Sequence, residues 1–215
     1  MTDELDLVSK LEPDVRSRRE FGLKCISPDD SKYGETSLKL ADELSFHDEW
    51  MAAAYVQRTL LETRVEFGQA EQRHLEEVDT ALEKISPLNM ILIEEQITRH
   101  DQLAVIEEIG RYVSPETKAL LHPGTTSYDI LDTARSFLFR KAWNEKIRPV
   151  ICEGIEKICK FAEGTMDVLQ VGRTHLQNTS PVPFGVTLAG YARRLAQRVD
   201  LCDSYFKNLR GTITG

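Results

Sequence analysis

The sequence lacks the features that mark membrane, secreted and nucleic-acid-binding proteins. No apolar run reaches the roughly 18 residues that a membrane-spanning helix needs. The N-terminal stretch "MTDELDLVSKLEPD" is acidic and lacks the basic-then-apolar order of a signal peptide. The net charge of −8, with 29% charged residues, leaves no basic stripe for nucleic acid. We therefore expect a cytoplasmic protein that binds neither membranes nor nucleic acids.

Cysteine is also sparse and lacks metal-binding spacing. The chain has four cysteines, none in a C-x-x-C pair or beside a cluster of histidines. This spacing gives no zinc motif, so we expect no metal site. Cys152 and Cys159 lie seven positions apart, which places them on one face of a helix. We interpret them as two core thiols in a reducing compartment.

The apolar pattern predicts an all-α fold with long helices, and 41% hydrophobic residues suffice for a sizeable core. Helices are expected over residues 42–67, 69–85, 88–112, 128–164 and 184–209, with a kink or break at Pro149. Residues 166–185 combine proline, glycine and β-favouring residues, which predicts an extended segment or loop. Helices of about 35 residues exceed the usual ~11–12 and need partners along their length. We therefore expect an oligomer.

Three segments are expected along the chain. Residues 1–30 read as a polar, loosely ordered arm, and residues 31–112 as a small N-terminal helical domain. Residues 113–215 read as the first part of a central helical bundle, because the chain stops at "LRGTITG" without a helix cap or polar tail.

An unusual hydroxyl cluster lies in "LLHPGTTSYDILDTA", residues 120–134. Thr125, Thr126 and Ser127 follow His122 and Gly124 at a predicted helix start. Serine or threonine there can simply cap the helix. A helix N-terminus also attracts carboxylate or phosphate through its unpaired N–H groups. One cap needs one hydroxyl, so the excess favours an anion site.

Two further polar clusters contain histidine. In "VGRTHLQ", His175 lies between Thr174 and Gln177 in a non-helical segment, where it could exchange a proton near neutral pH; a turn-stabilising cluster is the alternative. In "TRHD", His100 and Asp101 are expected in mid-helix, pointing about 100° apart, so helix geometry alone cannot bring them into a tight pair. An exposed polar helix face is the alternative there. His47 and His74 lie in charged helical stretches and are expected at the surface or facing a partner.

These blocks together resemble the fumarase/aspartase superfamily. The resemblance is carried by "GTTSYDILDTA" and "VGRTHLQNTSPVPFGVTLAGYARRL", and it runs from about Ser31 to Gly215. Within the superfamily, "TRHD" followed by "HPGTTSYD" is similar to the adenylosuccinate lyase family, as is "LRGTITG". The resemblance implies a long-helix bundle, a homotetramer with shared active sites and no cofactor. The implied reaction is β-elimination of fumarate from adenylosuccinate and from the succinylaminoimidazole carboxamide ribotide, in purine nucleotide biosynthesis.

The resemblance also implies roles for individual residues. His175 matches the general acid that protonates the departing nitrogen, and His100 is a second candidate catalytic residue. Substrate-binding residues are expected near the succinyl carboxylates, the nucleotide and its phosphate: Lys32, Tyr33, Asp101, His122, Thr125, Thr126, Ser127, Thr174 and Gln177.

The chain departs from the family pattern in two places. Lys32-Tyr33 stands where the family has Arg-Tyr; lysine can meet a phosphate but lacks the two-pronged fork of arginine. The family's general base is a serine in a Ser-Ser-x-Met-Pro-x-Lys-x-Asn-Pro-like loop, and no such motif occurs in residues 1–215. We therefore expect an N-terminal portion of a longer enzyme, inactive alone.

Two alternatives stay open. One is another lyase of the superfamily, of the argininosuccinate lyase or carboxymuconate cycloisomerase type. "TRHD" counts against both, and the cycloisomerases tend to lack the histidine of "RTH". The other is a non-catalytic helical oligomerisation module, in which Thr126 and Ser127 merely cap a helix and His175 is structural.

Overall fold

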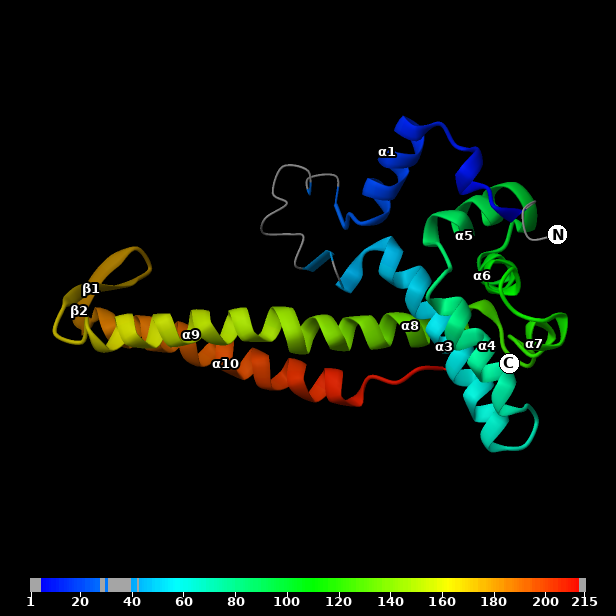
Figure 1. The fold of residues 1–215 in the computed structure, drawn as a ribbon. Coiled ribbons are helices and arrows are strands. Elements are labelled where there is room, and N and C mark those ends of the chain that lie inside the picture. The colour runs from blue at the N-terminus through cyan, green and yellow to red at the C-terminus, as the bar shows by residue number, and fades with distance from the viewer. Residues whose placement is uncertain (1–4, 28–29, 31–39, 42, 213–215) are drawn as a thin grey trace. The chain divides into compact units, whose positions relative to one another are not determined.

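The computed structural model describes residues 5–27, 30, 40–41 and 43–212, and it confirms the all-α fold class. Contacts divide the chain into two units, Met1–Phe139 with Arg210–Gly215 and Arg140–Leu209. Helices dominate both units (Figure 1). The three-segment organisation expected from the sequence stays a prediction.

The first unit contains short and medium helices that cover one another's apolar faces. In chain order, its described elements are η2 (Val8–Lys10), α1 (Pro13–Leu23), α3 (Phe46–Glu66), α4 (Gln72–Leu82), α5 (Pro87–Ile93), the π-helical turn η3 (Glu94–Thr98), α6 (Asp101–Gly110), α7 (Pro115–Ala119) and most of α8 (Ser127–Ala142).

Serine and proline set where several of these helices begin. The hydroxyls of Ser45, Ser86 and Ser114 each accept a hydrogen bond from the backbone N–H three residues later. Pro87 and Pro115 then occupy the first helical turn. Proline fits this position because its missing N–H would have no partner within the helix. Local sequence therefore fixes the starts of α3, α5 and α7.

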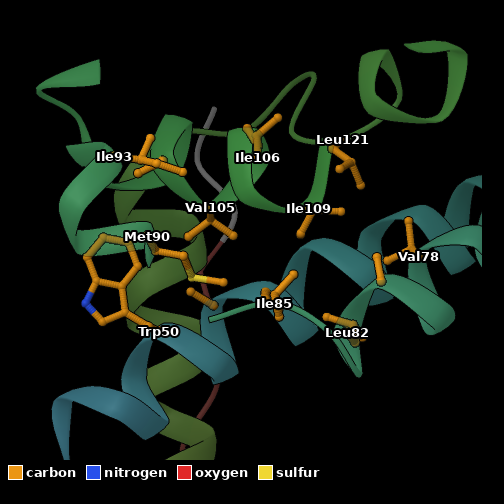
Figure 2. Close-up of a cluster of buried hydrophobic side chains, with 14 of the residues drawn as sticks. Trp50, Val78, Leu82, Ile85, Met90, Ile93, Val105, Ile106, Ile109 and Leu121 are labelled. Atoms are coloured by element: carbon orange, nitrogen blue, oxygen red, sulfur yellow. The ribbon is translucent and has the colours of Figure 1, made fainter. Parts of the chain in front are cut away.

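The core of the first unit lies among α3, α4, α5 and α6. Met90, Ile93, Val105 and Ile109 are fully buried, and Figure 2 shows their side chains converging with that of Trp50. The apolar face of each helix recurs every three or four residues, so each helix contributes several of these side chains.

A buried asparagine attaches the N-terminal segment to this core. The Asn89 amide donates to the carbonyl of Leu5, and its oxygen accepts from the backbone N–H of Leu7, both at 2.9 Å. Leu7, Val8 and Leu23 are themselves buried. Part of the segment read as a polar arm is therefore helical and contributes to the core.

The prediction of a single helix over residues 88–112 is wrong. The chain forms α5, η3 and α6 instead, with a break at Arg99, whose φ is 53°. The Thr98 hydroxyl donates to the carbonyl of His100 at 2.9 Å within the break. An apolar stripe reveals helical periodicity, but a single left-handed residue leaves the stripe almost unchanged.

The second unit is a pair of long helices joined by a β-hairpin. A π-helical turn, η4 (Trp143–Ile147), leads into α9 (Arg148–Glu163), and α10 (Phe184–Asn208) runs beside α9 (Figure 1). Strands β1 (Leu169–Thr174) and β2 (Gln177–Pro183) pair antiparallel between them. This hairpin confirms the expected extended segment.

Close contacts hold η4 and α9 against α10. The Trp143 ring stacks on Phe206 at 5.2 Å, and its indole N–H donates to Asp203 at 2.8 Å. At the hairpin end, a Cβ added to Gly185 would collide with the carbonyl oxygen of Ala162. Glycine is therefore required there by close approach rather than by its backbone freedom.

Pro149 is accommodated by a wider helical turn, so the chain stays helical from Ser127 to Glu163. A proline ring inside an α-helix collides with the carbonyl four residues earlier. The π-helical turn η4 lies directly before α9, which has Pro149 in its first turn. Such a turn admits one extra residue and relieves the collision.

The apolarity of the helices and the burial of the cysteines concern two expectations from the sequence. Among the described residues, no helix combines the length and apolarity needed to cross a bilayer. All four cysteines are free, Cys159 is exposed and Cys152 is half-buried. The interpretation of these two as core thiols is therefore wrong, because spacing places residues on one helix face without showing whether anything covers it.

Candidate functional site

The hydroxyls at the start of α8 contact two histidines. The Ser127 hydroxyl lies 3.2 Å from Nε2 of His100. The Thr125 hydroxyl donates to the carbonyl of His122 at 2.7 Å and lies 3.1 Å from its Nδ1. The helix start is held separately, since the backbone N–H of Thr126 donates to the buried Asp129 carboxylate at 2.9 Å. Capping alone therefore does not account for the hydroxyl cluster.

His100 is the N-cap of α6 and not a mid-helix residue as expected. Its Nδ1 accepts from the backbone N–H of Leu103 at 3.4 Å and lies 3.3 Å from the Asp101 carboxylate. His100 and Asp101 were not expected to pair through helix geometry alone; their contact forms because His100, directly after the left-handed Arg99, has an extended backbone outside the helix. His100 stays partly exposed at 44% of its side chain, so it can still meet a ligand.

His122 sits in a strained, half-buried loop. Its φ is 73°, a left-handed value that costs energy for a residue with a Cβ. Burial lowers the pKa of its imidazole below the ordinary value, and the nearby His100 adds to this, against the opposing carboxylates of Asp101 and Asp129. His122 is therefore a neutral hydrogen-bonding group near pH 7.

Two buried glutamines that the sequence reading missed lie behind His122. The amide nitrogen of Gln57, on α3, is 3.0 Å from Nδ1 of His122 and 3.3 Å from Oε1 of Gln102, on α6. Both glutamines are fully buried. Gln57 offers one faint signal in the sequence: it is polar, yet it lies four residues from Ala53 and from Leu61 on the apolar face of α3.

A cavity of about 150 Å³ opens next to Asp101 and Gln102. Four elements of the first unit line it, through Phe46, Glu49, Trp50, Ala53, Glu94, Asp101, Gln102, Leu131 and Arg135. Arg135 bonds to Glu49 at 2.7 Å and 3.1 Å. Burial raises the pKa of the Glu94 carboxyl, and the neighbouring Asp101 and Glu95 carboxylates raise it further. The cavity thus combines aromatic walls with a charged rim.

The second unit carries His175 at the tip of its hairpin. Thr174 and Gln177 form the last strand pair, and His175 and Leu176 make a two-residue turn with φ values of 49° and 62°. Such turns strongly prefer Asn-Gly, because both residues need positive φ. Histidine here is locally unfavourable, which is typical of functional positions.

Lys32, Tyr33 and His74 are further residues for which the sequence raised an expectation. Lys32 and Tyr33 lie outside the residues that the structure describes. His74 is 3% exposed, and its Nδ1 accepts from the backbone N–H of Glu71 at 3.0 Å. The expectation that His74 lies at the surface is therefore wrong, because it caps α4. Within the described ranges, no group of three or more His, Cys, Asp or Glu side chains could hold a metal ion.

The structure thus brings His100, Asp101, His122, Thr125 and Ser127 together in the first unit. Histidine nitrogens, hydroxyls and a helix N-terminus can bind an anion and exchange protons with it. His175 with its flanking residues belongs to the second unit. Each unit therefore carries its own cluster of candidate residues.

Comparison with known proteins gives a consistent family. A family model described as "Lyase" matches residues 28–213. An adenylosuccinate lyase of Staphylococcus saprophyticus is 32% identical over 119 residues, which cover 55% of this chain and 26% of that protein. An adenylosuccinate lyase of Synechocystis is 28% identical over 149 residues, which cover 67% of this chain and 33% of that protein. The chain thus spans about a quarter to a third of the length of these relatives.

Solved structures share the fold at low sequence identity. A fumarate lyase from Mesorhizobium matches 77% of this chain and 39% of that chain, with a TM-score of 0.70 and 21% identity. A 3-carboxy-cis,cis-muconate lactonizing enzyme from Pseudomonas putida matches 85% of this chain and 42% of that chain, with a TM-score of 0.73 and 19% identity. The chain therefore shares the fold of these two enzymes over the residues that match.

Proposed function

The chain belongs to the lyase family whose model it matches, and we propose that its residues take part in the β-elimination of fumarate from adenylosuccinate and from the succinylaminoimidazole carboxamide ribotide. The observation that carries the proposal is the meeting of His100, Ser127, Thr125 and His122 at the start of α8. Both curated relatives are named adenylosuccinate lyase, which supports adenylosuccinate as the substrate over the substrates of other lyases.

The hydroxyls at the start of α8 suit a carboxylate of the succinyl group. In the elimination, a base removes a proton from the carbon beside a carboxylate, and negative charge builds on that group. Thr126 and Ser127 would donate to this carboxylate, and the N-terminus of α8 would add its partial positive charge. Donors fixed in place before the reaction stabilise such charge without having to reorganise.

His175 suits the role of general acid. When the carbon–nitrogen bond breaks, its electron pair moves to the nitrogen, which must take up a proton. The His175 imidazole would give that proton, leaving fumarate and AMP as products, or fumarate and the aminoimidazole carboxamide ribotide. Its place on a two-residue turn keeps the imidazole at the tip of the hairpin. Thr174 and Gln177 would contact the substrate beside it.

The remaining expected residues suit the nucleotide half of the substrate. His100, Asp101 and His122 would hold the nucleotide and its phosphate, as the resemblance implies, and Lys32 and Tyr33 would touch the phosphate. The adjacent cavity has Trp50 and Phe46 in its walls. No cofactor is needed for this reaction.

We further propose that the protein is a homotetramer with shared active sites. Apolar side chains of α9 and α10 that are at least two-fifths exposed support assembly: Val150, Phe161, Val186, Tyr191, Leu195, Leu201 and Tyr205. Light scattering after size exclusion tests this, and a monomer at tens of micromolar would contradict it.

Ligand binding by matched variants tests the proposed site. Thr126→Ala and His175→Ala should each weaken AMP or fumarate binding roughly 10- to 150-fold in calorimetry, since a hydrogen bond to a charged group contributes about 1.5–3 kcal/mol. The control is Thr59→Ala, which removes an exposed hydroxyl that bonds only within α3. If the two site variants lose stability but not affinity, the non-catalytic oligomerisation module is the better account.

Turnover is a separate test of the same proposal. Residues 1–215 contain no match to the serine loop of the family, so we propose that this chain alone binds ligand and releases little fumarate. Fumarate absorbance after mixing with adenylosuccinate measures this directly. Release at rates near the usual enzyme range of ~1–10³ s⁻¹ would contradict the assignment of the base to that loop.

The cycloisomerase type is the second candidate. It is favoured by the TM-score of 0.73 to the muconate lactonizing enzyme, whereas the curated sequence relatives favour adenylosuccinate. Binding of 3-carboxymuconate in preference to AMP would reverse this ranking.

A further inference from the structure

Gln57 occupies a position where its side chain is unexpected. It lies in the interior of α3, fully buried, four residues from Ala53 and from Leu61 on the apolar face. An unpaired amide in such a place costs free energy, so buried amides are almost always hydrogen-bonded. Leucine or methionine would fill the same space without that cost. The amide of Gln57 therefore calls for an explanation beyond packing.

The contacts of Gln57 connect the two histidine segments. Its amide nitrogen, which carries two hydrogens, lies 3.0 Å from Nδ1 of His122 and 3.3 Å from Oε1 of Gln102. Gln102 is the second residue of α6 and follows directly after His100 and Asp101. One buried side chain of α3 thus bridges the loop that carries His122 and the helix start that carries His100.

Helix α3 holds the strained loop at a second point. Arg64, seven residues after Gln57 and so on the same side of the helix, donates to the carbonyl of Pro123. His122 keeps a left-handed backbone with φ of 73°, a conformation that persists only when its surroundings enforce it. Gln57 and Arg64 provide that enforcement at the imidazole and at the next residue.

We propose that Gln57 is a positioning residue that selects the tautomer of His122: its amide N–H donates to Nδ1, so the proton of the neutral imidazole sits on Nε2. The use of this tautomer in ligand binding rests on the proposed function, but the tautomer itself belongs to the ligand-free chain. His122 then acts as a hydrogen-bond donor through Nε2 alone.

The same contact opposes protonation of His122. An imidazolium carries N–H on both nitrogens, so its Nδ1–H would point at the N–H of Gln57. The charged groups around the ring act in both directions: His100 opposes a positive charge, while Asp101 at α6 and Asp129 at α8 favour it. Gln57 thus acts in the same direction as His100.

Nitrogen NMR of the ligand-free 215-residue chain tests the proposal. With ¹⁵N-labelled histidine, and with His122→Gln to assign the signal, we expect His122 to carry its proton on Nε2. Gln57→Met keeps the volume but removes the donor, so the two tautomers should mix. Gln57→Glu supplies an acceptor, which should move the proton to Nδ1 and raise the pKa of His122 by about 1 unit or more.

The matched control is Gln72→Glu. It adds the same charge at the exposed start of α4 and should leave the His122 tautomer unchanged. If buried glutamate prevents folding, Gln57→Met carries the comparison, and the tautomer of the unaltered chain decides by itself. A proton on Nδ1 in the unaltered chain, or an unchanged tautomer in Gln57→Met, overturns the proposal. Failure of the proposed function would appear instead in the ligand affinities of Thr126→Ala and His175→Ala.

Discussion

Nε2 of His100 lies 3.2 Å from the hydroxyl of Ser127, which joins two residues 27 positions apart. The contact connects the start of α6 to the start of α8, so two helix N-termini share one polar cluster. Each is a site of partial positive charge. An anion bound between them would meet both.

Removing this hydroxyl should reduce affinity without unfolding the protein. For Ser127→Ala we expect fumarate or AMP to bind about 3–10-fold more weakly, with little change in melting temperature, because the hydroxyl is half-buried and its loss leaves no cavity. Ser114→Ala is the matched contrast: Ser114 caps α7 through Thr117, so its loss should cost ~1 kcal/mol of stability and no affinity. If Ser127→Ala instead loses stability and keeps its affinity, Ser127 has a capping role.

Stability should depend on pH through His122. Burial lowers its pKa in the folded protein below the ordinary value of 6.5, so between the two values the unfolded chain binds more protons. Stability therefore rises with pH through this window, is fully present above it and is lost as the pH falls through it. Urea unfolding at closely spaced pH values, compared with His122→Gln, should show a shallower slope in the variant. Identical slopes would mean that His122 titrates normally.

Two glycines of α10 should respond in opposite ways to alanine. Gly185→Ala places a Cβ against the carbonyl of Ala162, and overpacking of this kind costs about 1–3 kcal/mol. Gly190 lies in the same helix with open space around it, so Gly190→Ala should add up to ~1 kcal/mol through helix propensity. Thermal unfolding distinguishes them, and equal shifts would show that α9 and α10 do not pack as closely as described.

The hairpin turn offers a test of stored strain. Leu176 is 91% exposed with a φ of 62°, so Leu176→Gly loses little buried surface and should stabilise the protein by roughly 1 kcal/mol. Val171→Gly, on the neighbouring strand, should instead destabilise it, because glycine weakens a strand interior. Differential scanning calorimetry measures both, and a loss of stability in Leu176→Gly would indicate that its side chain is held by contacts.

Local signals in the sequence were enough to predict many elements. The change in composition near Phe184 predicted the beginning of α10. The short helix α7, which Ser114 caps and Pro115 begins, was not predicted. The break at Arg99 was not predictable in this way, since one left-handed residue leaves the apolar periodicity intact. Pro149 signalled an irregularity, but not that a π-helical turn would absorb it.

The candidate site was predictable only in part. His100, His122 and Ser127 each belong to a short motif, and the structure brings them together. Gln57 belongs to no motif, and its contact with His122 joins residues 65 positions apart. Contacts of that range are set by helix packing, so a polar residue on the apolar face of α3 signals a buried amide but does not reveal His122 as its partner.

Arg99, His122, His175 and Leu176 all have left-handed backbones, and each is within one residue of a residue proposed to bind or react. At these positions, substitutions that raise the melting temperature should therefore tend to reduce ligand binding or catalysis. A directed-evolution library screened only for melting temperature would favour glycine or asparagine at these positions, because both tolerate positive φ. Such a screen would enrich thermostable variants that have lost His122 or His175. Thermostabilised versions of this protein should therefore be selected for ligand binding and melting temperature together.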